Sequence, residues 1–149
     1  MTMTPTTTFE AEIRTVIEAQ VQAIRDKNAK AVVSLYAPDS VIFDLAPPLR
    51  NPSSGPALEA SLNAWFATWQ GPIGYEARDF SITANEALAF CHGFVRIKGT
   101  KVDGERNDLW IRQTLCLKNV DGAWKIVHDH TSVPFYMDGS YKAAIDLKP

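Results

Sequence analysis

The sequence has little cysteine, no long apolar run and almost no net charge. Its two cysteines, Cys91 and Cys116, form no CxxC motif, which excludes a disulfide framework and favours buried thiols in a reducing compartment. No apolar stretch approaches the ~20 residues that a membrane-spanning helix needs. With a formal net charge of −2, the chain lacks the basic surface typical of nucleic-acid binding. These absences predict a cytoplasmic protein without nucleic-acid or membrane partners.

Motifs for nucleotide cofactors and for nucleophilic catalysis are also lacking. The chain contains no Gly-rich phosphate loop and no GxGxxG fingerprint, and it shows no Ser-His-Asp order. We therefore expect no cofactor.

The composition predicts one globular domain. The chain has 149 residues, of which 46% are hydrophobic and 21% are charged, which is average for a soluble domain of ordinary size. Residues 1–8 are rich in Thr and Pro, lack the pattern of a signal peptide and are expected to form a flexible tail. Residues 9–134 form the domain, and residues 135–149 form a C-terminal extension.

Helical periodicity appears in three segments of the first half of the chain. Thr7 and Glu10 have the spacing of a capping box at the start of the first segment. Pro38 ends the second segment, because proline disfavours helix in the residue before it. Gly71 and Pro72 follow the third segment in the order typical of a helix end. The predicted helices span residues 9–27, 28–37 and 58–69.

The rest of the chain has strand character. Asp103-Gly104 and Asp121-Gly122 are hairpin turns, and such short connections require antiparallel neighbours. Helices that are segregated from an antiparallel sheet define an α+β fold. The predicted strands span residues 40–45, 75–83, 87–98, 107–118 and 123–133.

The order of elements and three motifs resemble the nuclear transport factor 2-like (NTF2-like) superfamily. The motifs are Tyr36–Asp39, Phe43–Asp44 and the Gly-x-Trp-x-Ile-x-His-x-His-x-Ser segment of residues 122–132. The most similar branch is the SnoaL-like group, which includes ketosteroid isomerase relatives and the association domain of calmodulin-dependent kinase II. Over residues 9–134, the resemblance implies a cone: three helices packed on a bent antiparallel sheet that encloses a pocket. It also implies a homodimer formed through the outer face of the sheet.

Strand alternation divides the last predicted strand into two faces. The bulkier set is expected to face the interior of the cone, and the other set is expected to face outward. The first set is Trp124, Ile126, His128, His130 and Ser132; the second is Lys125, Val127, Asp129 and Thr131.

The histidines of this strand are candidate site residues. We expect His130 to line the pocket and carry a proton, because imidazole titrates near neutral pH, and His128 to contact the ligand beside it. A metal site would need a third ligand such as His92, and the resemblance implies that the pair works without metal. His92 is therefore assigned to ligand binding and no metal is expected. Hydrogen-bonded core histidines remain the alternative.

The resemblance to ketosteroid isomerases implies that Asp44 is a general base. Their catalytic aspartate also ends the first strand, where a carboxylate beside an apolar cavity removes a proton from carbon. The family's two oxyanion donors, however, fall near Gln20 and Thr114. Loss of one such donor costs about 3 kcal/mol, so the residues argue against a steroid isomerase. The alternative for Asp44 is a strand-end residue that caps the next loop.

Arg112 is the candidate anchor for an acidic or carbonyl group. An arginine in an apolar strand is costly unless it meets a carboxylate or a ligand anion, and it resembles arginines inside the cone of the kinase association domains. The alternatives are a salt bridge with a carboxylate or an outward side chain. The possible partners of such a bridge are Asp44, Asp108 and Glu59.

Aromatic side chains are expected to form the pocket walls, although core packing explains most of them equally well. These candidates are Tyr36, Trp65, Trp69 and Trp110. The resemblance implies a small apolar ligand with a carbonyl or acidic group and acid–base chemistry of an isomerase, cyclase or hydrolase. The alternative is a non-catalytic dimerisation module with a vestigial pocket, because one fold supports many functions.

The C-terminal extension carries an apolar run that is too large to stay in water. It comprises Phe135, Tyr136 and Met137, directly after Pro134, which ends the sheet ladder. We expect this run to fold back over the open end of the cone or onto a partner subunit. Residues 141–147 are predicted to form a final turn or short helix.

Overall fold

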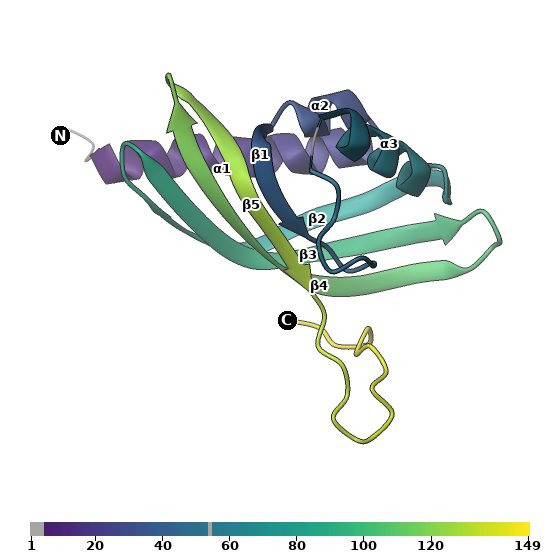
Figure 1. Cartoon of the computed structure of the whole chain (residues 1–149). Coiled ribbons are helices and arrows are strands. Elements are labelled where there is room, and N and C mark those ends of the chain that lie inside the picture. The colour runs from purple at the N-terminus through teal and green to yellow at the C-terminus, as the bar shows by residue number, and fades with distance from the viewer. Residues whose placement is uncertain (1–4, 54) are drawn as a thin grey trace.

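The computed structural model describes residues 5–53 and 55–149. Over these residues the predicted α+β class is confirmed: three helices pack on one bent, five-stranded sheet (Figure 1). The helices are α1 (Pro5–Arg25), α2 (Ala29–Val33) and α3 (Gly55–Phe66). The strands are β1 (Tyr36–Phe43), β2 (Trp69–Ala84), β3 (Leu88–Lys101), β4 (Arg106–Val120) and β5 (Ala123–Ser132).

The sheet is mixed, whereas a wholly antiparallel sheet was expected. Its strand order is β1-β5-β4-β3-β2. β2 to β5 pair antiparallel, whereas β1 pairs in parallel with β5, with Val41 opposite His128 and Phe43 opposite His130. The short turns constrain only β2 to β5. The chain between β1 and β5 contains α3 and three strands, so nothing local dictates the direction in which β1 joins the edge.

Helix α1 is the long helix that the sheet wraps. Its apolar stripe places Ile13, Ile17 and Ile24 in the core. The helix begins at Pro5, so Thr7 lies inside it and is no N-cap; proline is tolerated in a first turn because its missing N–H has no helical partner there. Helix α1 therefore includes residues 5–8 of the predicted flexible tail, and residues 1–4 of that tail lie outside the described chain.

None of the helices in the described part of the chain combines the length and apolarity that spanning a bilayer requires.

The predicted C-terminal ends of the second and third helices are wrong. Pro38 lies within β1 and does not end α2, which stops at Val33. An edge strand accepts proline because its missing N–H costs no ladder bond there. Helix α3 ends at Phe66, and Trp69 starts β2. The Trp69 and Trp65 rings pack edge to face with centroids 5.8 Å apart. Trp69 therefore packs beside Trp65, as a residue of the next helical turn would, although it belongs to a strand.

The core consists of two clusters that α1 bridges. One lies under α2 and α3 and includes Ile24, Val32 and Phe66. The other lies under the first turns of α1 and includes Ile13 and Leu115. Helix α1 thus joins the two clusters, with Ile13 in one and Ile24, near the C-terminal end of the helix, in the other.

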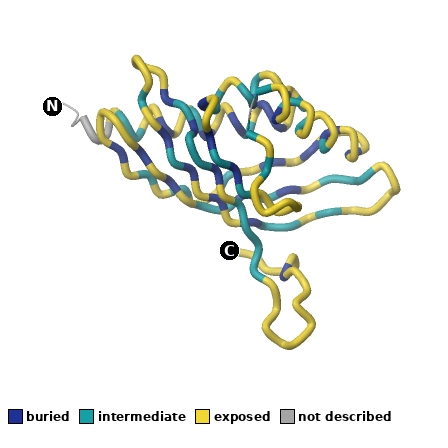
Figure 2. The backbone as a smooth tube through the Cα atoms, viewed as in Figure 1, coloured by how far each residue is buried: buried dark blue, intermediate teal, exposed yellow. Residues whose placement is uncertain are grey.

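A β-bulge in β5 reverses the expected faces of that strand. Leu117 pairs with Ile126 and Cys116 with His128, so Val127 is an extra residue. Beyond this bulge Asp129 is buried, whereas His130 is exposed. The alternation of buried and exposed residues along the strands is visible in Figure 2. The prediction that His128 and His130 share the inner face with Ile126 is therefore wrong.

The C-terminal extension does not fold back over its own domain as one expectation had it. It leaves β5 and projects away from the helical layer (Figure 1). It forms a hairpin closed by a bridge between Phe135 and Ala143. Residues 145–146 form a turn and no helix follows. Almost the whole segment is exposed (Figure 2).

Candidate functional site

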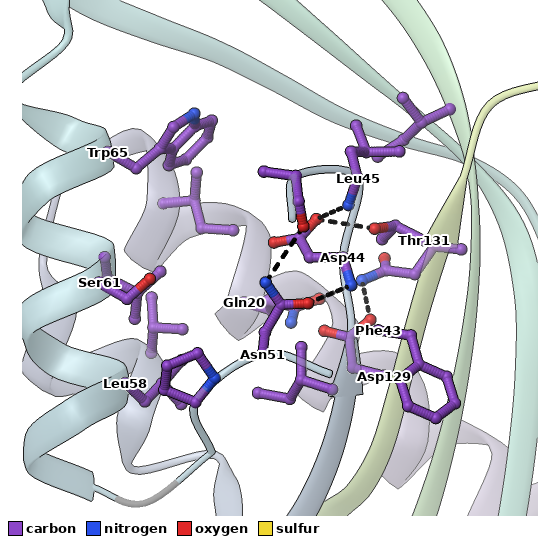
Figure 3. A pocket seen from close by; sticks show the side chains of 18 of the residues that line it. Gln20, Phe43, Asp44, Leu45, Asn51, Leu58, Ser61, Trp65, Asp129 and Thr131 are labelled. Carbon is purple, nitrogen blue, oxygen red and sulfur yellow. Dashed lines mark hydrogen bonds between the residues drawn. The ribbon is translucent and has the colours of Figure 1, made fainter. Parts of the chain in front are cut away.

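A cavity of about 270 Å³ opens between α1, α3, β1 and the inner face of the sheet. Most of its wall is apolar, and the loop after β1 forms one rim (Figure 3). An apolar, partly enclosed space with a few polar groups is the usual form of a small-molecule site. The apolar lining residues include Ile24, Val32, Ile42, Leu58, Leu62, Trp65, Ile97 and Ile111.

Four polar side chains from four different elements meet at the floor of this cavity. The Tyr36 hydroxyl on β1 donates to Oδ2 of Asp129 on β5 at 2.5 Å. Nε2 of Gln20 on α1 donates to the Tyr36 hydroxyl at 2.7 Å. Nε2 of Gln113 on β4 donates to Oδ1 of Asp129 at 3.0 Å and lies 3.3 Å from Oε1 of Gln20. Both carboxyl oxygens of a buried aspartate thus have a donor.

Burial makes Asp129 easier to protonate than an ordinary aspartate. Desolvation raises its pKa, while the hydrogen bonds from Tyr36, Gln113 and Gln20 act in the opposite direction. The pKa of Tyr36 lies well above its usual value, first through burial and then through the charge of Asp129. Burial likewise raises the pKa of Tyr75, another lining residue. The floor of the cavity therefore favours neutral groups.

The protonation state of Asp129 decides which way the Tyr36 hydrogen points. When Asp129 is ionised, the phenol donates to it. When Asp129 is protonated, the carboxyl proton can occupy the 2.5 Å contact with Tyr36. The phenol oxygen then accepts from both Asp129 and Gln20, and its own hydrogen is free to donate into the cavity. The cluster can thus present an O–H donor to a ligand oxygen.

A second carboxyl group, Asp44, lies at the rim of the same cavity. Its Oδ1 accepts from the Thr131 hydroxyl at 2.8 Å and from the Leu45 N–H at 2.7 Å (Figure 3). Asn51 accepts the Asp44 N–H at 2.8 Å. Asp44 therefore caps its own loop and also faces the cavity. Its position is compatible with both interpretations, the loop cap and the carboxylate beside an apolar cavity. One cavity thus holds a buried carboxyl and an exposed one.

The described residues that line the cavity include no Arg, Lys or His. Their ionisable groups are the carboxyls of Asp44 and Asp129 and the phenols of Tyr36 and Tyr75. A ligand anion would meet negative charge without a compensating cation. The cavity chemistry therefore suits an uncharged ligand.

Three of the predicted site residues line this cavity: Tyr36, Asp44 and Trp65. Trp69 does not, because α3 ends before it and the side chain enters the core, where it is only 5% exposed. The structure therefore does not bring Trp69 to the cavity where we expected it.

Arg112 and Trp110 lie on the outer face of the sheet. The β4 alternation buries the neighbouring inner residues and exposes Arg112, whose Nε donates to the Ser132 hydroxyl at 3.0 Å. Trp110 lies beneath the guanidinium groups of Arg78 and Arg96, at 5.5 and 5.8 Å from the ring centroid. The structure contradicts a cavity role for both residues, because strand alternation points them away from it.

The three histidines also lie on the outer face. His92 is exposed there through the β3 alternation. His128 approaches the Val41 carbonyl through Nδ1 at 2.7 Å and packs edge to face on Phe43. His130 lies in a groove beside the loop after β1. The bulge in β5 therefore removes His128 and His130 from the cavity, contrary to prediction. No three His, Cys, Asp or Glu residues of the described chain are arranged to hold a metal ion.

Gln113, Asp129 and Thr131 also line the cavity, although they were not among the predicted site residues. Gln113 had a detectable signal, because it lies on the same strand face as Ile111 and Leu115. A lone polar residue in such an apolar set indicates an internal hydrogen bond. Gln20 had the same signal on the apolar stripe of α1. Asp129 and Thr131 had none, because the bulge that turns them inward has no sequence mark.

The fold and the cavity define a cone-shaped, NTF2-like α+β domain with an internal polar cluster. The chain belongs to the SnoaL-like domain family, whose profile matches residues 13–136. A similar solved structure is an NTF2-like protein of unknown function from Pseudomonas putida, with 32% identity and a TM-score of 0.86 over 98% of this chain and 100% of that chain.

Two further structures share the fold at low identity. A candidate scytalone dehydratase from Novosphingobium aromaticivorans is 17% identical, with a TM-score of 0.74 over 92% of this chain and 91% of that chain. A candidate dehydratase of the NTF2-like family from Streptomyces avermitilis is 15% identical, with a TM-score of 0.73 over 87% and 97%. Among curated proteins, none matches the chain by sequence.

Proposed function

We propose that this protein is an acid–base enzyme that removes a proton from a carbon next to a carbonyl group of a small, uncharged, largely apolar ligand. The observation that carries the proposal is the pair of carboxyl groups facing one apolar cavity, Asp129 buried at the floor and Asp44 exposed at the rim. Two carboxyls in contrasting environments favour different protonation states, which is the usual basis for separate acid and base roles.

Tyr36 and Asp129 bind and polarise the ligand oxygen. Protonated Asp129 donates to Tyr36, and Tyr36 donates to the carbonyl. Asp44, held by Thr131 at 2.8 Å, takes the proton from the adjacent carbon. The C–H electron pair forms a C=C bond, and the carbonyl electrons move to the oxygen, where the Tyr36 hydrogen bond stabilises the charge. One such donor is typically worth about 3 kcal/mol in the transition state.

The enolate has two outcomes within the same geometry. Where the ligand carries a C=C bond next to the deprotonated carbon, return of the proton from Asp44 to the far carbon of that bond gives the conjugated isomer. Loss of a β-hydroxyl group that takes this proton gives water and an unsaturated ketone. Two structures with the same fold carry the name dehydratase, which supports the second outcome, the loss of water.

An acidic ligand group is no part of the proposal. That expectation depended on Arg112, which lies on the outer face. The lining described above holds no replacement cation. The desolvation free energy of a carboxylate would therefore not be offset by an ion pair.

Matched two-ring probes test the binding site. We expect the ketone 2-acetylnaphthalene and the phenol 2-naphthol to bind in calorimetry, and 2-naphthoate to bind at least tenfold more weakly at neutral pH. Equal binding of naphthoate would contradict the uncharged-ligand assignment.

Isotope exchange tests the chemistry directly. In D₂O the protein should accelerate deuterium incorporation into the acetyl methyl group of 2-acetylnaphthalene, measured by NMR. Asp44→Asn should abolish the acceleration and retain binding, whereas Arg112→Ala serves as the control and should leave both unchanged. Exchange at the buffer rate with wild-type protein would overturn the proposed proton abstraction.

A further inference from the structure

The C-terminal arm, defined as residues 134–149, exposes more apolar surface than a free chain end normally does. Its shape is held by its own hydrogen bonds: the Tyr136 N–H donates to the Lys142 carbonyl at 2.8 Å and the Ala144 N–H to the Pro134 carbonyl at 2.7 Å. Six large apolar side chains nevertheless remain in solvent, namely Phe135, Tyr136, Met137, Tyr141, Ile145 and Leu147. Contiguous exposed apolar residues of this kind mark an interaction surface.

An outer groove lies between the loop after β1 and β5, and residues 43–47 line both this groove and the cavity. It is lined by residues 43–50 and His130. The Leu49 side chain is 98% exposed, and Arg50 lies beside it as a cation. The described lining of this groove includes no residue of the arm, so the arm does not fill the groove of its own chain.

The tip of the arm and one part of the outer groove are complementary in polarity and charge. At the arm's tip Met137, 82% exposed, is followed by Asp138. Hydrogen bonds from the Ser140 N–H and hydroxyl hold Asp138 and lower its pKa, so it remains an anion. The outer groove offers apolar loop residues together with Asp44, Arg50 and His130, and Arg50 directly follows the exposed Leu49. The exposed Met137–Asp138 pair at the arm's tip thus has an apolar and oppositely charged counterpart in the Leu49–Arg50 pair of the groove.

We propose that the C-terminal arm of one copy docks into the outer groove of a second copy, with Met137 against Leu49 and Asp138 beside Arg50. Because both halves of the contact occur in every chain, a twofold pairing fills two grooves with two arms and closes the assembly. The arm's aromatic and Met side chains, together with arginine in the groove, match the composition of protein–protein interface cores.

The outer face of the sheet supplies the remaining contact area. A stable interface buries about 800 Å² on each partner, which is more than a short arm tip provides. The arm projects toward the side opposite the helices (Figure 1). The outer face there carries aromatic side chains, including Phe90 at 49% exposure and Trp110. The second copy can therefore contact sheet and groove together.

Oligomeric state tests the docking. Wild-type protein should sediment as a dimer at micromolar concentration. Leu49→Asp and Met137→Asp should each raise the dimer dissociation constant tenfold or more, as loss of an interface anchor does. Val102→Asp is the matched control: Val102 is 64% exposed in the β3–β4 turn and should change nothing. All three positions are exposed, so circular dichroism should show an unchanged fold.

A charge exchange and a cross-link identify the contact itself. Asp138→Arg and Arg50→Asp should each weaken the dimer, and the double variant should restore it. In a Cys116→Ser background, an equimolar mixture of the Leu49→Cys and Met137→Cys proteins should give a disulfide-linked heterodimer on oxidation. A monomeric wild type, a dimer indifferent to both apolar variants, or a cross-link formed only when both cysteines are on one chain would overturn the proposal.

Discussion

The hydroxyl of Tyr36 lies 2.5 Å from Oδ2 of Asp129, although 93 residues separate the two in the sequence. β1 and β5 are adjacent in the sheet, and the parallel pairing brings both side chains to the floor of the cavity. The pair joins the fold to the proposed chemistry, since the same hydrogen bond stabilises the sheet edge and sets the direction of the Tyr36 proton.

Asp129 should make stability depend on pH in a direction unusual for a carboxylate. Its pKa is raised by burial, so the folded state keeps the proton longer than the unfolded state, whose aspartate titrates near ~3.9. Stability is highest below that value and falls as the pH rises through the folded pKa.

Asp129→Asn removes this titration. In urea unfolding at several pH values, wild type should lose stability relative to the variant as the pH rises from about 4, by 1.4 kcal/mol for each unit by which the pKa is raised. Parallel pH profiles for the two proteins would show that Asp129 is not preferentially protonated in the fold.

Tyr36→Phe should destabilise the protein by about 1–3 kcal/mol, because it leaves a buried oxygen of Asp129 and the amide of Gln20 without their partner. It should also raise the pKa of Asp129 further, since the phenol hydrogen bond lowers it. Urea unfolding measures the first effect. Tyr141→Phe, at a side chain that is 69% exposed, is the control and should leave stability unchanged.

Gly93→Ala should destabilise the fold through overpacking. A Cβ at Gly93 would lie 2.5 Å from Cδ1 of Phe80, whose ring packs on both core clusters. The expected cost is about 1–3 kcal/mol, and Phe80→Leu should recover part of it when combined with Gly93→Ala. Gly55→Ala meets only Val33 Cγ1 at 3.8 Å and is the matched control. If the stability losses of Gly93→Ala and Phe80→Leu simply add in the double variant, the clash is disproved.

Arg112→Ala should change neither ligand binding nor folding appreciably. The side chain is exposed on the outer face and holds one hydrogen bond, to Ser132, so we expect a stability change within about 0.5 kcal/mol. Calorimetry with 2-acetylnaphthalene should give the wild-type affinity. A large loss of affinity would mean that Arg112 reaches the ligand after all.

The sequence alone determined the α+β class, the long amphipathic first helix and the antiparallel hairpins of β2 to β5. Each of these follows from local rules: the spacing of Ile13, Ile17 and Ile24 matches one helix face, and Asp103-Gly104 specifies a tight turn. The cavity residues Tyr36, Asp44 and Trp65 were also recognisable, since their element and position along the chain decide where they point.

Only the tertiary structure decided the rest of the site. The parallel pairing of β1 with β5 joins segments far apart in the sequence, and no turn encodes its direction. The extra residue at Val127 fits the register of β4 rather than any local propensity, yet it turns Asp129 inward and His130 outward. Side chains of a strand alternate strictly between the two faces of the sheet only while the hydrogen-bond ladder is regular. One bulge therefore moves every side chain beyond it to the opposite face.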